Sequence, residues 1–428
     1  MPRHLSAVRD HRLVTAASCR LLAGLVLVLV LPACSLQTEW SAAARPSRPA
    51  TDGELAAVEA VPSENVEPPG PSGQHARNLI LVIGDGMGGE QLRAASLYET
   101  GADDGLRVHS LPVTGSIATS SASVSVTDSA AAGTALATGV KVQNGVVGLR
   151  LPGDGGELPA ITAELQDRGW AIGLVTTAFT THATPAAFAA HVASRTDYGG
   201  IADDYLTGLR PDLLLGGGGY GMDPATVGAA GYTVVRDSSG LAHATEAALP
   251  GERIAGLFGR GHLPYLADGR SDGTPGLVEM AEAAVDVLAR DDEGFFLMIE
   301  AARIDHAGHA NDIARLIPEV LELDAVVEML VDHPALQEDT LLVVTADHET
   351  GGLAVTSSMG KGTLPEVTWS TTGHTAVDVP LYAIGPGAEA LAEVVDNTMV
   401  RRAMTAAIGS PEPAPAMTAR AIGAASEE

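Results

Sequence analysis

Residues 78–84 read NLILVIG, and Asp85 and a glycine-rich turn follow them directly. A short apolar run bounded by turn residues is typical of a strand that is buried on both faces of a sheet. Comparable runs occur at 170–177, 212–215, 295–300, 341–345 and 380–385, separated by amphipathic or alanine-rich segments such as 277–290 and 312–330. This alternation predicts an α/β fold with a mostly parallel central sheet and helices on both faces.

Composition limits the domain organisation and the class of partner. The chain has 428 residues, is 46% hydrophobic and carries a formal net charge of -28. A chain of this size can bury one large core, which we assign to residues 77–410. The excess of acid argues against nucleic acid as the main partner, and any anion site needs local positive charge from metal ions or a helix amino terminus. Residues 34–76 and 411–428 lack apolar periodicity and are predicted to be a disordered tether and tail.

The amino terminus has the pattern of an export signal. Arginines precede an apolar run at 21–31, and Leu31-Pro32-Ala33-Cys34 is similar to a bacterial lipobox. We therefore expect a signal peptide at 1–33, lipid attachment at Cys34, and a protein anchored to a bacterial membrane on the periplasmic side or the outer surface. Plain secretion is the alternative. Cys19 and Cys34 are the two cysteines of the chain, so the mature domain has no disulfide.

A serine begins the most alanine-rich helical segment. Ser129 follows Asp128 and precedes residues 130–138, which Gly139 ends. Its hydroxyl would lie at the positive end of a helix, where a base or a metal ion could activate it as a nucleophile. The alternative is that Asp128 or Ser129 only caps the helix.

Charged residues at other strand ends supply the types of ligand that metal ions need. A strand as apolar as 295–299 is rarely followed by charged groups unless these are paired or bind metal. His182 and Thr184 begin another predicted helix, which we expect to end near Arg195, a residue able to clamp two phosphate oxygens. Carboxylates, imidazoles and a hydroxyl suit two zinc-like sites and one magnesium-like site. The candidate ligands in these segments are Asp85, Thr184, Glu300, Asp305, His309, Asp347, His348 and His374, and we expect Asp128, His182 and His306 to lie beside them or near the phosphate. A serine beside such sites predicts phosphoryl transfer.

Six segments in order closely resemble the alkaline phosphatases: NLILVIGDGMG, VTDSAAAGTALATGVK, THATPAAFAAHVASR, EAARIDHAGH, VTADHETGG and TTGHTAVDVPLYAIGPGA. The resemblance covers residues 78–387 and implies an alkaline phosphatase that cleaves small phosphate monoesters through a phosphoserine at Ser129, with Arg195 gripping the phosphate. We expect such an enzyme to serve in scavenging inorganic phosphate. It implies two Zn²⁺ ions and one Mg²⁺ ion. The first zinc would be bound by Asp305, His309 and His374, the second by Asp85, Asp347, His348 and Ser129, and the magnesium by Asp85, Thr184 and Glu300. Asp128 would orient its neighbours.

Two positions depart from one well-known bacterial version of this pattern. His182 and His306 stand where that version has an aspartate and a lysine near magnesium and phosphate. An imidazole at position 182 favours a softer ion than Mg²⁺. The segment 352–373 is short, which implies a reduced crown and an open site, and leaves a homodimer possible. The alternatives are a phosphodiesterase or a metabolite-specific phosphatase on the same metal platform, and a non-catalytic lipoprotein that binds metal or phosphate.

Overall fold

The computed structural model of the protein describes residues 75–270, 273–336 and 338–409. The predicted signal peptide, Cys34, most of the tether and the tail at 411–428 lie outside this range. The folded body includes Ala76, one residue ahead of the predicted boundary, because its side chain is buried and its amide donates to the Ala407 carbonyl at 2.8 Å. Within the described residues, no helix combines the length and the apolar character needed to cross a membrane.

A nine-stranded sheet forms the centre of the body, in the order β2-β13-β8-β1-β7-β3-β4-β6-β5. Its seven strands from β8 to β5 run parallel, β13 pairs antiparallel with β8, and the edge strand β2 pairs antiparallel with β13. The prediction of a mostly parallel sheet is therefore confirmed. The strands are β1 (Asn78–Gly84), β2 (Val113–Ile117), β3 (Ala171–Phe179), β4 (Leu213–Gly218), β5 (Tyr232–Val235), β6 (Arg253–Arg260), β7 (Phe295–Ala301), β8 (Thr340–Ala346) and β13 (Val379–Ile384).

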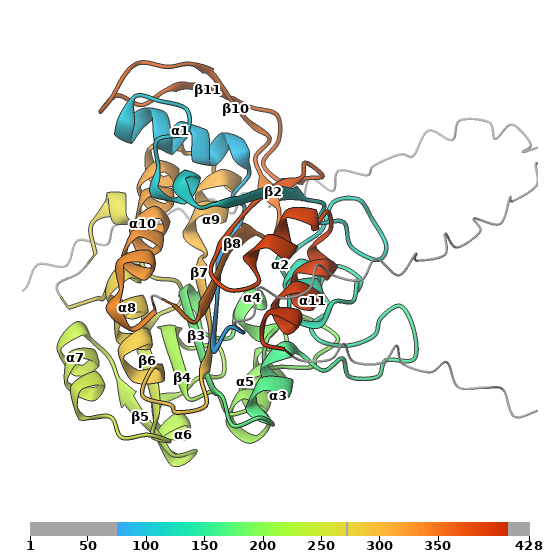
Figure 1. Ribbon diagram of the computed structural model, residues 1–428, viewed down its shortest axis with the longest axis vertical. Helices are drawn as coiled ribbons and strands as arrows, with labels where there is room; N and C mark the ends of the chain where they lie inside the picture. The colour runs from blue at the N-terminus through green and yellow to red at the C-terminus, as the bar shows by residue number, and fades with distance from the viewer. Residues whose placement is uncertain (1–74, 271–272, 337, 410–428) are drawn as a thin grey trace, which may run out of the picture. The chain divides into compact units, whose positions relative to one another are not determined.

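Helices cover both faces of this sheet, as predicted (Figure 1). One layer includes α8 and α10, which contact β3, β7 and β1, and the other includes α2, α3, α4 and α11. The helices are α1 (Gly89–Thr100), α2 (Ser129–Thr138), α3 (Ile161–Gln166), α4 (Ala183–Ala186), α5 (Tyr198–Thr207), α6 (Pro224–Ala229), α7 (Ser238–Ala247), α8 (Leu277–Leu288), α9 (Arg303–His309), α10 (Ile313–Asp332) and α11 (Asn397–Ala407). Both faces of β1, β7 and β8 are covered, and every residue of these strands is buried.

Two small antiparallel pairs complete the fold. The short segment 352–373 contains the hairpin β10 (Leu353–Ser357) and β11 (Glu366–Trp369). Strand β12 (His374–Thr375) pairs with β9 (Glu349–Thr350), so that His374 lies opposite Thr350. This second pair ties the loop before β13 to the end of β8.

The prediction that a helix begins at His182 and Thr184 and ends near Arg195 is wrong about the length of that helix. Helix α4 ends at Ala186, and Val192 instead forms an antiparallel backbone bridge with Val147. The amide of His191 donates to the Asp204 carboxylate at 2.7 Å. These tertiary partners take the backbone groups that a longer helix would have paired, so Arg195 lies in a loop.

Candidate active site

The predicted polar residues lie at the carboxyl-terminal end of the central sheet, where the four neighbouring strands β8, β1, β7 and β3 all end. Gly84, which ends β1, is in register with Ala301 of β7 and Ala346 of β8. Asp85 and Asp347 therefore leave adjacent strands at the same level. Glu300 lies one residue inside β7, opposite Thr176 of β3.

Ser129 is the first residue of α2 and is 2% exposed. Asp128 is the N-cap, and its side chain accepts from the Ala131 amide at 3.1 Å. Because this cap leaves Ser129 on the first turn, the serine hydroxyl lies at the positive end of the helix. Its Oγ is 3.3 Å from Nε2 of His348.

The first group of candidate ligands is formed by Asp85, Asp347 and His348, all completely buried. Nε2 of His348 lies 3.6 Å from Oδ1 of Asp85 and 3.2 Å from Oδ2 of Asp347. Neither oxygen of Asp85 accepts a hydrogen bond. Burial raises the pKa of Asp85 well above its usual value, and the Asp347 charge raises it further. Buried carboxylates with free oxygens fit a cation, and this mixed set of oxygen and nitrogen ligands suits Zn²⁺.

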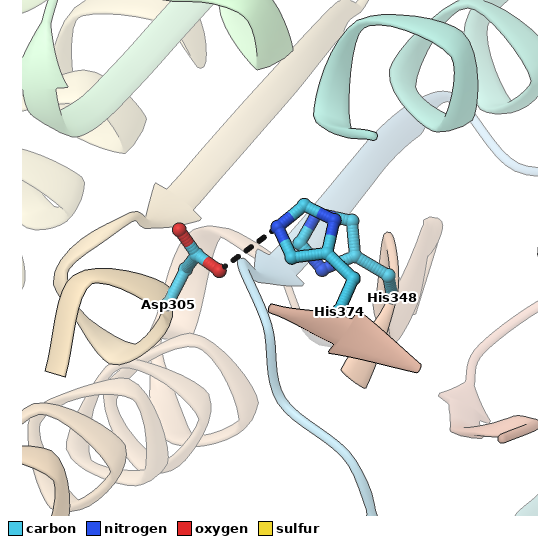
Figure 2. Close-up of side chains that lie close together, drawn as sticks. All are labelled: Asp305, His348 and His374. Atoms are coloured by element: carbon cyan, nitrogen blue, oxygen red, sulfur yellow. Dashed lines mark ion pairs between the residues drawn. The ribbon is translucent and has the colours of Figure 1, made fainter. Parts of the chain in front are cut away.

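Asp305, His309 and His374 form the second group. Asp305 and His309 are four residues apart in α9, so both side chains lie on one helix face, with Nε2 of His309 3.3 Å from Oδ2 of Asp305. Nε2 of His374 lies 3.5 Å from Oδ1 of Asp305 (Figure 2). Burial alone would raise the pKa of Asp305, but hydrogen bonds from His309 and His374 hold it well below its usual value.

The two groups adjoin each other. The rings of His348 and His374 stack with centroids 3.5 Å apart, and Figure 2 shows both beside Asp305. Thr350 links the groups, because its Oγ1 donates to Oδ1 of Asp305 at 2.5 Å and lies 3.3 Å from Nδ1 of His348. Two ions held by these groups would therefore be neighbours.

A third group surrounds Glu300. Oε2 of Glu300 accepts from Thr176, whereas Oε1 of Glu300, Nδ1 of His182 and Oγ1 of Thr184 are buried without a hydrogen bond. Ligand atoms of Asp85, His182 and Glu300 all lie within 4.8 Å of one another. Burial raises the pKa of Glu300 to about 7. Oxygen ligands from Asp85, Glu300 and Thr184 suit Mg²⁺, and His182 adds an imidazole to this site.

Arg195 is held by Asp128. Its Nη1 donates to Oδ2 of Asp128 at 3.0 Å, and its backbone amide donates to the Gly145 carbonyl at 2.7 Å. Asp128 also accepts from the Gly145 amide at 3.0 Å. Nη2 of Arg195 lies 3.4 Å from Nε2 of His182. One carboxylate thus caps the helix of Ser129 and positions the guanidinium.

His306 does not join the three ligand groups. Its Nδ1 lies 2.9 Å from Nη1 of Arg303, and its ring centroid is 4.3 Å from that of His262 and 5.9 Å from that of His182. Burial lowers the pKa of His306 to about 3 and that of His262 to about 4. His306 therefore belongs to a group of neutral imidazoles beside the third site.

Sequence reasoning missed three residues of this site: Thr176, His262 and Thr350. Thr350 lies within the HETGG segment, so its position close to the predicted ligands Asp347 and His348 could have identified it as a residue of the site. Thr176 is one of many threonines in buried strands, and His262 is a single histidine in a glycine-rich loop. Neither carries a local pattern that points to the site.

Comparisons with known proteins agree with this geometry. Residues 76–365 match the family model described as alkaline phosphatase. The chain is 34% identical to the streptomycin-6-phosphate phosphatase of Streptomyces griseus, with 78% of this chain and 91% of that protein covered. It is 30% identical to the alkaline phosphatase of Escherichia coli K12, with 79% and 87% covered.

Solved structures show the same similarity. The alkaline phosphatase of the Antarctic bacterium TAB5 is 28% identical and superposes with a TM-score of 0.69, covering 79% of this chain and 99% of that one. A histidine-to-glutamate variant of the TAB5 enzyme was solved with Mg bound in its M3 site, and it is 27% identical to this chain, with a TM-score of 0.69 and the same coverage.

Proposed function

This chain belongs to the alkaline phosphatase family and is a metal-binding hydrolase of phosphate monoesters. We propose that it works through a phosphoserine at Ser129 with two zinc ions and one magnesium ion. The observation that carries the proposal is the position of Ser129. Its buried hydroxyl lies 3.3 Å from His348, at the amino end of α2 and beside two adjoining groups of carboxylate and imidazole ligands.

The proposed ligand sets follow the three groups. Asp305, His309 and His374 would hold one zinc ion, and Asp85, Asp347 and His348 the other. Asp85, Thr184 and Glu300 would hold magnesium, because their carboxylate and hydroxyl oxygens are the ligands that Mg²⁺ prefers. When bound, such ions supply Lewis acidity and lower the pKa of a nearby hydroxyl or water.

Three side chains of the protein have separate roles in the proposed reaction. The hydroxyl of Ser129 loses its proton to solvent, its Oγ attacks phosphorus to form a new O–P bond, and the bond to the alcohol breaks. The leaving alcohol takes a proton from solvent, and Arg195 holds two non-bridging oxygens while Asp128 fixes the guanidinium. Water then attacks phosphorus, the bond to Ser129 breaks, and phosphate and the free hydroxyl are released. A guanidinium that binds two non-bridging oxygens favours a monoester over a diester, because the phosphate of a monoester is doubly charged.

The first experiment compares hydrolysis of p-nitrophenyl phosphate by the wild-type chain after chelation and after zinc and magnesium are restored, from mildly acidic to strongly alkaline pH. Ser129→Ala should lower kcat by at least about 10³-fold. Ser110→Ala, an exposed serine on another element, serves as the matched control. Peptide mapping after an acid quench should find phosphate on Ser129. Full activity of Ser129→Ala would exclude Ser129 as the nucleophile. A preference of the wild-type enzyme for bis(p-nitrophenyl) phosphate over p-nitrophenyl phosphate would favour the phosphodiesterase alternative.

A dedicated metabolite phosphatase is the second candidate, because the Streptomyces griseus relative acts on streptomycin 6-phosphate by its name. A phosphate-scavenging enzyme should show similar kcat/KM values for many small esters. A dedicated enzyme should instead prefer streptomycin 6-phosphate over glycerol 3-phosphate by several orders of magnitude.

The cellular location is part of the same proposal. We infer export and lipid attachment at Cys34 from the lipobox-like pattern. Labelling with a radioactive fatty acid should mark the wild type, and Cys34→Ala should remain unlabelled and leave the membrane fraction.

A further inference from the structure

Three aromatic residues, which we call the aromatic shelf, extend the candidate active site along the sheet edge. Phe179 ends β3, Tyr220 follows β4 by two residues, and Tyr198 begins α5 three residues after Arg195. Strands β3 and β4 are neighbours and continue the row of strands that carries the metal-ligand groups. Ligand sites in such folds gather at the carboxyl ends of the strands, so the aromatic shelf lies where a substrate can extend.

The contacts within the aromatic shelf leave about half of Tyr220 exposed. Tyr220 stacks on Phe179 with centroids 4.0 Å apart and an interplanar angle of 21°. Tyr198 packs edge-on against both rings, at 5.0 Å from Tyr220 and 5.3 Å from Phe179. Phe179 is only 4% exposed, whereas Tyr220 is 48% exposed. A planar ligand can therefore stack on Tyr220 without any rearrangement of the protein core.

The backbone around Tyr220 is unusual for an exposed tyrosine. Residues 216–221 are glycine except for Tyr220, whose φ is 49°. A bulky residue in this left-handed region is strained, and glycine is the residue that fits it best. A Cβ at Gly217 would lie 1.6 Å from the Gly261 carbonyl oxygen, so the glycines allow β4 and the loop after β6 to approach. Packing explains these glycines, but it does not explain the exposed ring.

The aromatic shelf is continuous with the residues assigned to phosphate. His182, whose Nε2 lies 3.4 Å from Arg195, packs edge-on against Phe179 at 5.2 Å. His262 packs against Phe179 at 5.0 Å, and its loop is fixed on both sides. Gly261 donates to the Gly218 carbonyl, and Leu263 donates to that of Thr177, both at 2.9 Å. A rigid path therefore runs from Arg195 through His182 and Phe179 to Tyr220.

We propose that the aromatic shelf binds the base of a nucleoside monophosphate whose phosphate lies against Arg195, an inference that rests on the proposed monoesterase function. The ring of a phenyl ester is bonded to the phosphate oxygen and stays close to it. A nucleotide base is separated from its phosphate by the whole ribose, which gives it the reach to pass Phe179. Stacking on tyrosine requires only a planar face, so the four common bases all qualify.

The test compares adenosine 5′-monophosphate with ribose 5-phosphate, which share the phosphate and sugar and differ only in the base. In the wild type, kcat/KM should be about tenfold higher for the nucleotide. Tyr220→Ala should reduce this ratio to about one, whereas Tyr220→Phe, which keeps the ring, should stay within about twofold of the wild type. Leu249→Ala, which shortens an exposed side chain in the loop between α7 and β6, should leave the ratio unchanged.

Binding measured without turnover separates this proposal from the proposed function. In the Ser129→Ala background, calorimetry should give a dissociation constant about tenfold lower for the nucleotide than for ribose 5-phosphate, and Tyr220→Ala should remove the difference. Equal binding of both esters, or a preference that survives Tyr220→Ala, overturns the aromatic shelf even when hydrolysis is fast. A base-dependent preference in a protein without hydrolysis supports the aromatic shelf and refutes the enzyme mechanism. Tyr220→Gly, which relieves the positive φ, repeats the test if Tyr220→Ala fails to fold.

Discussion

Replacing Asp128 with asparagine should weaken phosphate binding with little effect on the fold. Asp128 accepts hydrogen bonds from the amides of Ala131 and Gly145 and from Arg195. Asparagine can still accept from both amides and remains a good N-cap. Its amide nitrogen would face Nη1 of Arg195, so a donor would meet a donor. The variant therefore loses one charge-assisted bond between side chains that are only 26% and 18% exposed.

The magnitude follows from that single bond. A hydrogen bond to a charged group contributes about 1.5 kcal/mol, which corresponds to about tenfold in an equilibrium constant. The inhibition constant for inorganic phosphate and KM for p-nitrophenyl phosphate should each rise about tenfold. Asp128→Ala should also lose about 1 kcal/mol of unfolding free energy, because the cap of α2 is removed. Steady-state inhibition and urea denaturation of the metal-loaded enzyme measure the two effects.

An exposed ion pair provides the control. Arg150 and Asp154 are 3.3 Å apart and largely exposed, so Asp154→Asn should leave phosphate inhibition unchanged. An unchanged inhibition constant in Asp128→Asn would show that the carboxylate does not position Arg195. If the inhibition constant for phosphate rises only in Asp128→Ala, the effect comes from the lost helix cap.

Four further outcomes are expected. Chelation should lower both activity and the melting temperature, and zinc with magnesium should restore them, because buried carboxylates repel one another without cations. His182→Asp should bind Mg²⁺ more tightly in calorimetric titrations, and equal affinity would contradict a softer third site. Burial raises the pKa of Glu319 to about 7 from 4.5, so the folded state keeps a proton that the unfolded state loses as pH rises between these values. Glu319→Gln should therefore gain stability over wild type across that interval, by up to about 3 kcal/mol in urea melts, and a constant difference would contradict the shift. Gly217→Ala should destabilise by at least about 2 kcal/mol, since its Cβ would meet the Gly261 carbonyl, whereas Gly89→Ala, with open space around it, should not.

The parts of the fold that follow from local pattern could be read from the sequence. The six predicted strands all lie in the central sheet, because strands that are buried on both faces, such as β1, have long apolar runs that stand out in the sequence. Strand β2 was not predicted, since it forms an edge of the sheet with alternating exposure and a central glycine. Strand β6 was missed for a related reason, because Gly256 and Gly259 interrupt its apolar run. Edge position and glycine both weaken the periodic signal on which such predictions depend.

Candidate ligands were predictable where charge follows an apolar strand. Asp85, Glu300 and Asp347 stand out because a buried carboxylate needs a partner or an ion, and the structure gathers them at adjacent strand ends. His262 carries no such signal. It reaches Phe179 because backbone hydrogen bonds on both sides of it join the loop after β6 to the ends of β4 and β3.

The sequence by itself determined the α/β class, the start of the helix at Ser129 and most of the ligand types, because each depends on residues close together in the chain. Only the tertiary structure decided which residues share a site. Parallel pairing of β8, β1, β7 and β3 places four distant strand ends at one edge, and β12 pairing with β9 brings His374 there. Tertiary contacts likewise ended α4 early, because backbone groups near Arg195 found partners at Val147 and Asp204. Neither kind of pairing is encoded in local periodicity, since each joins residues that lie in different elements or loops of the chain.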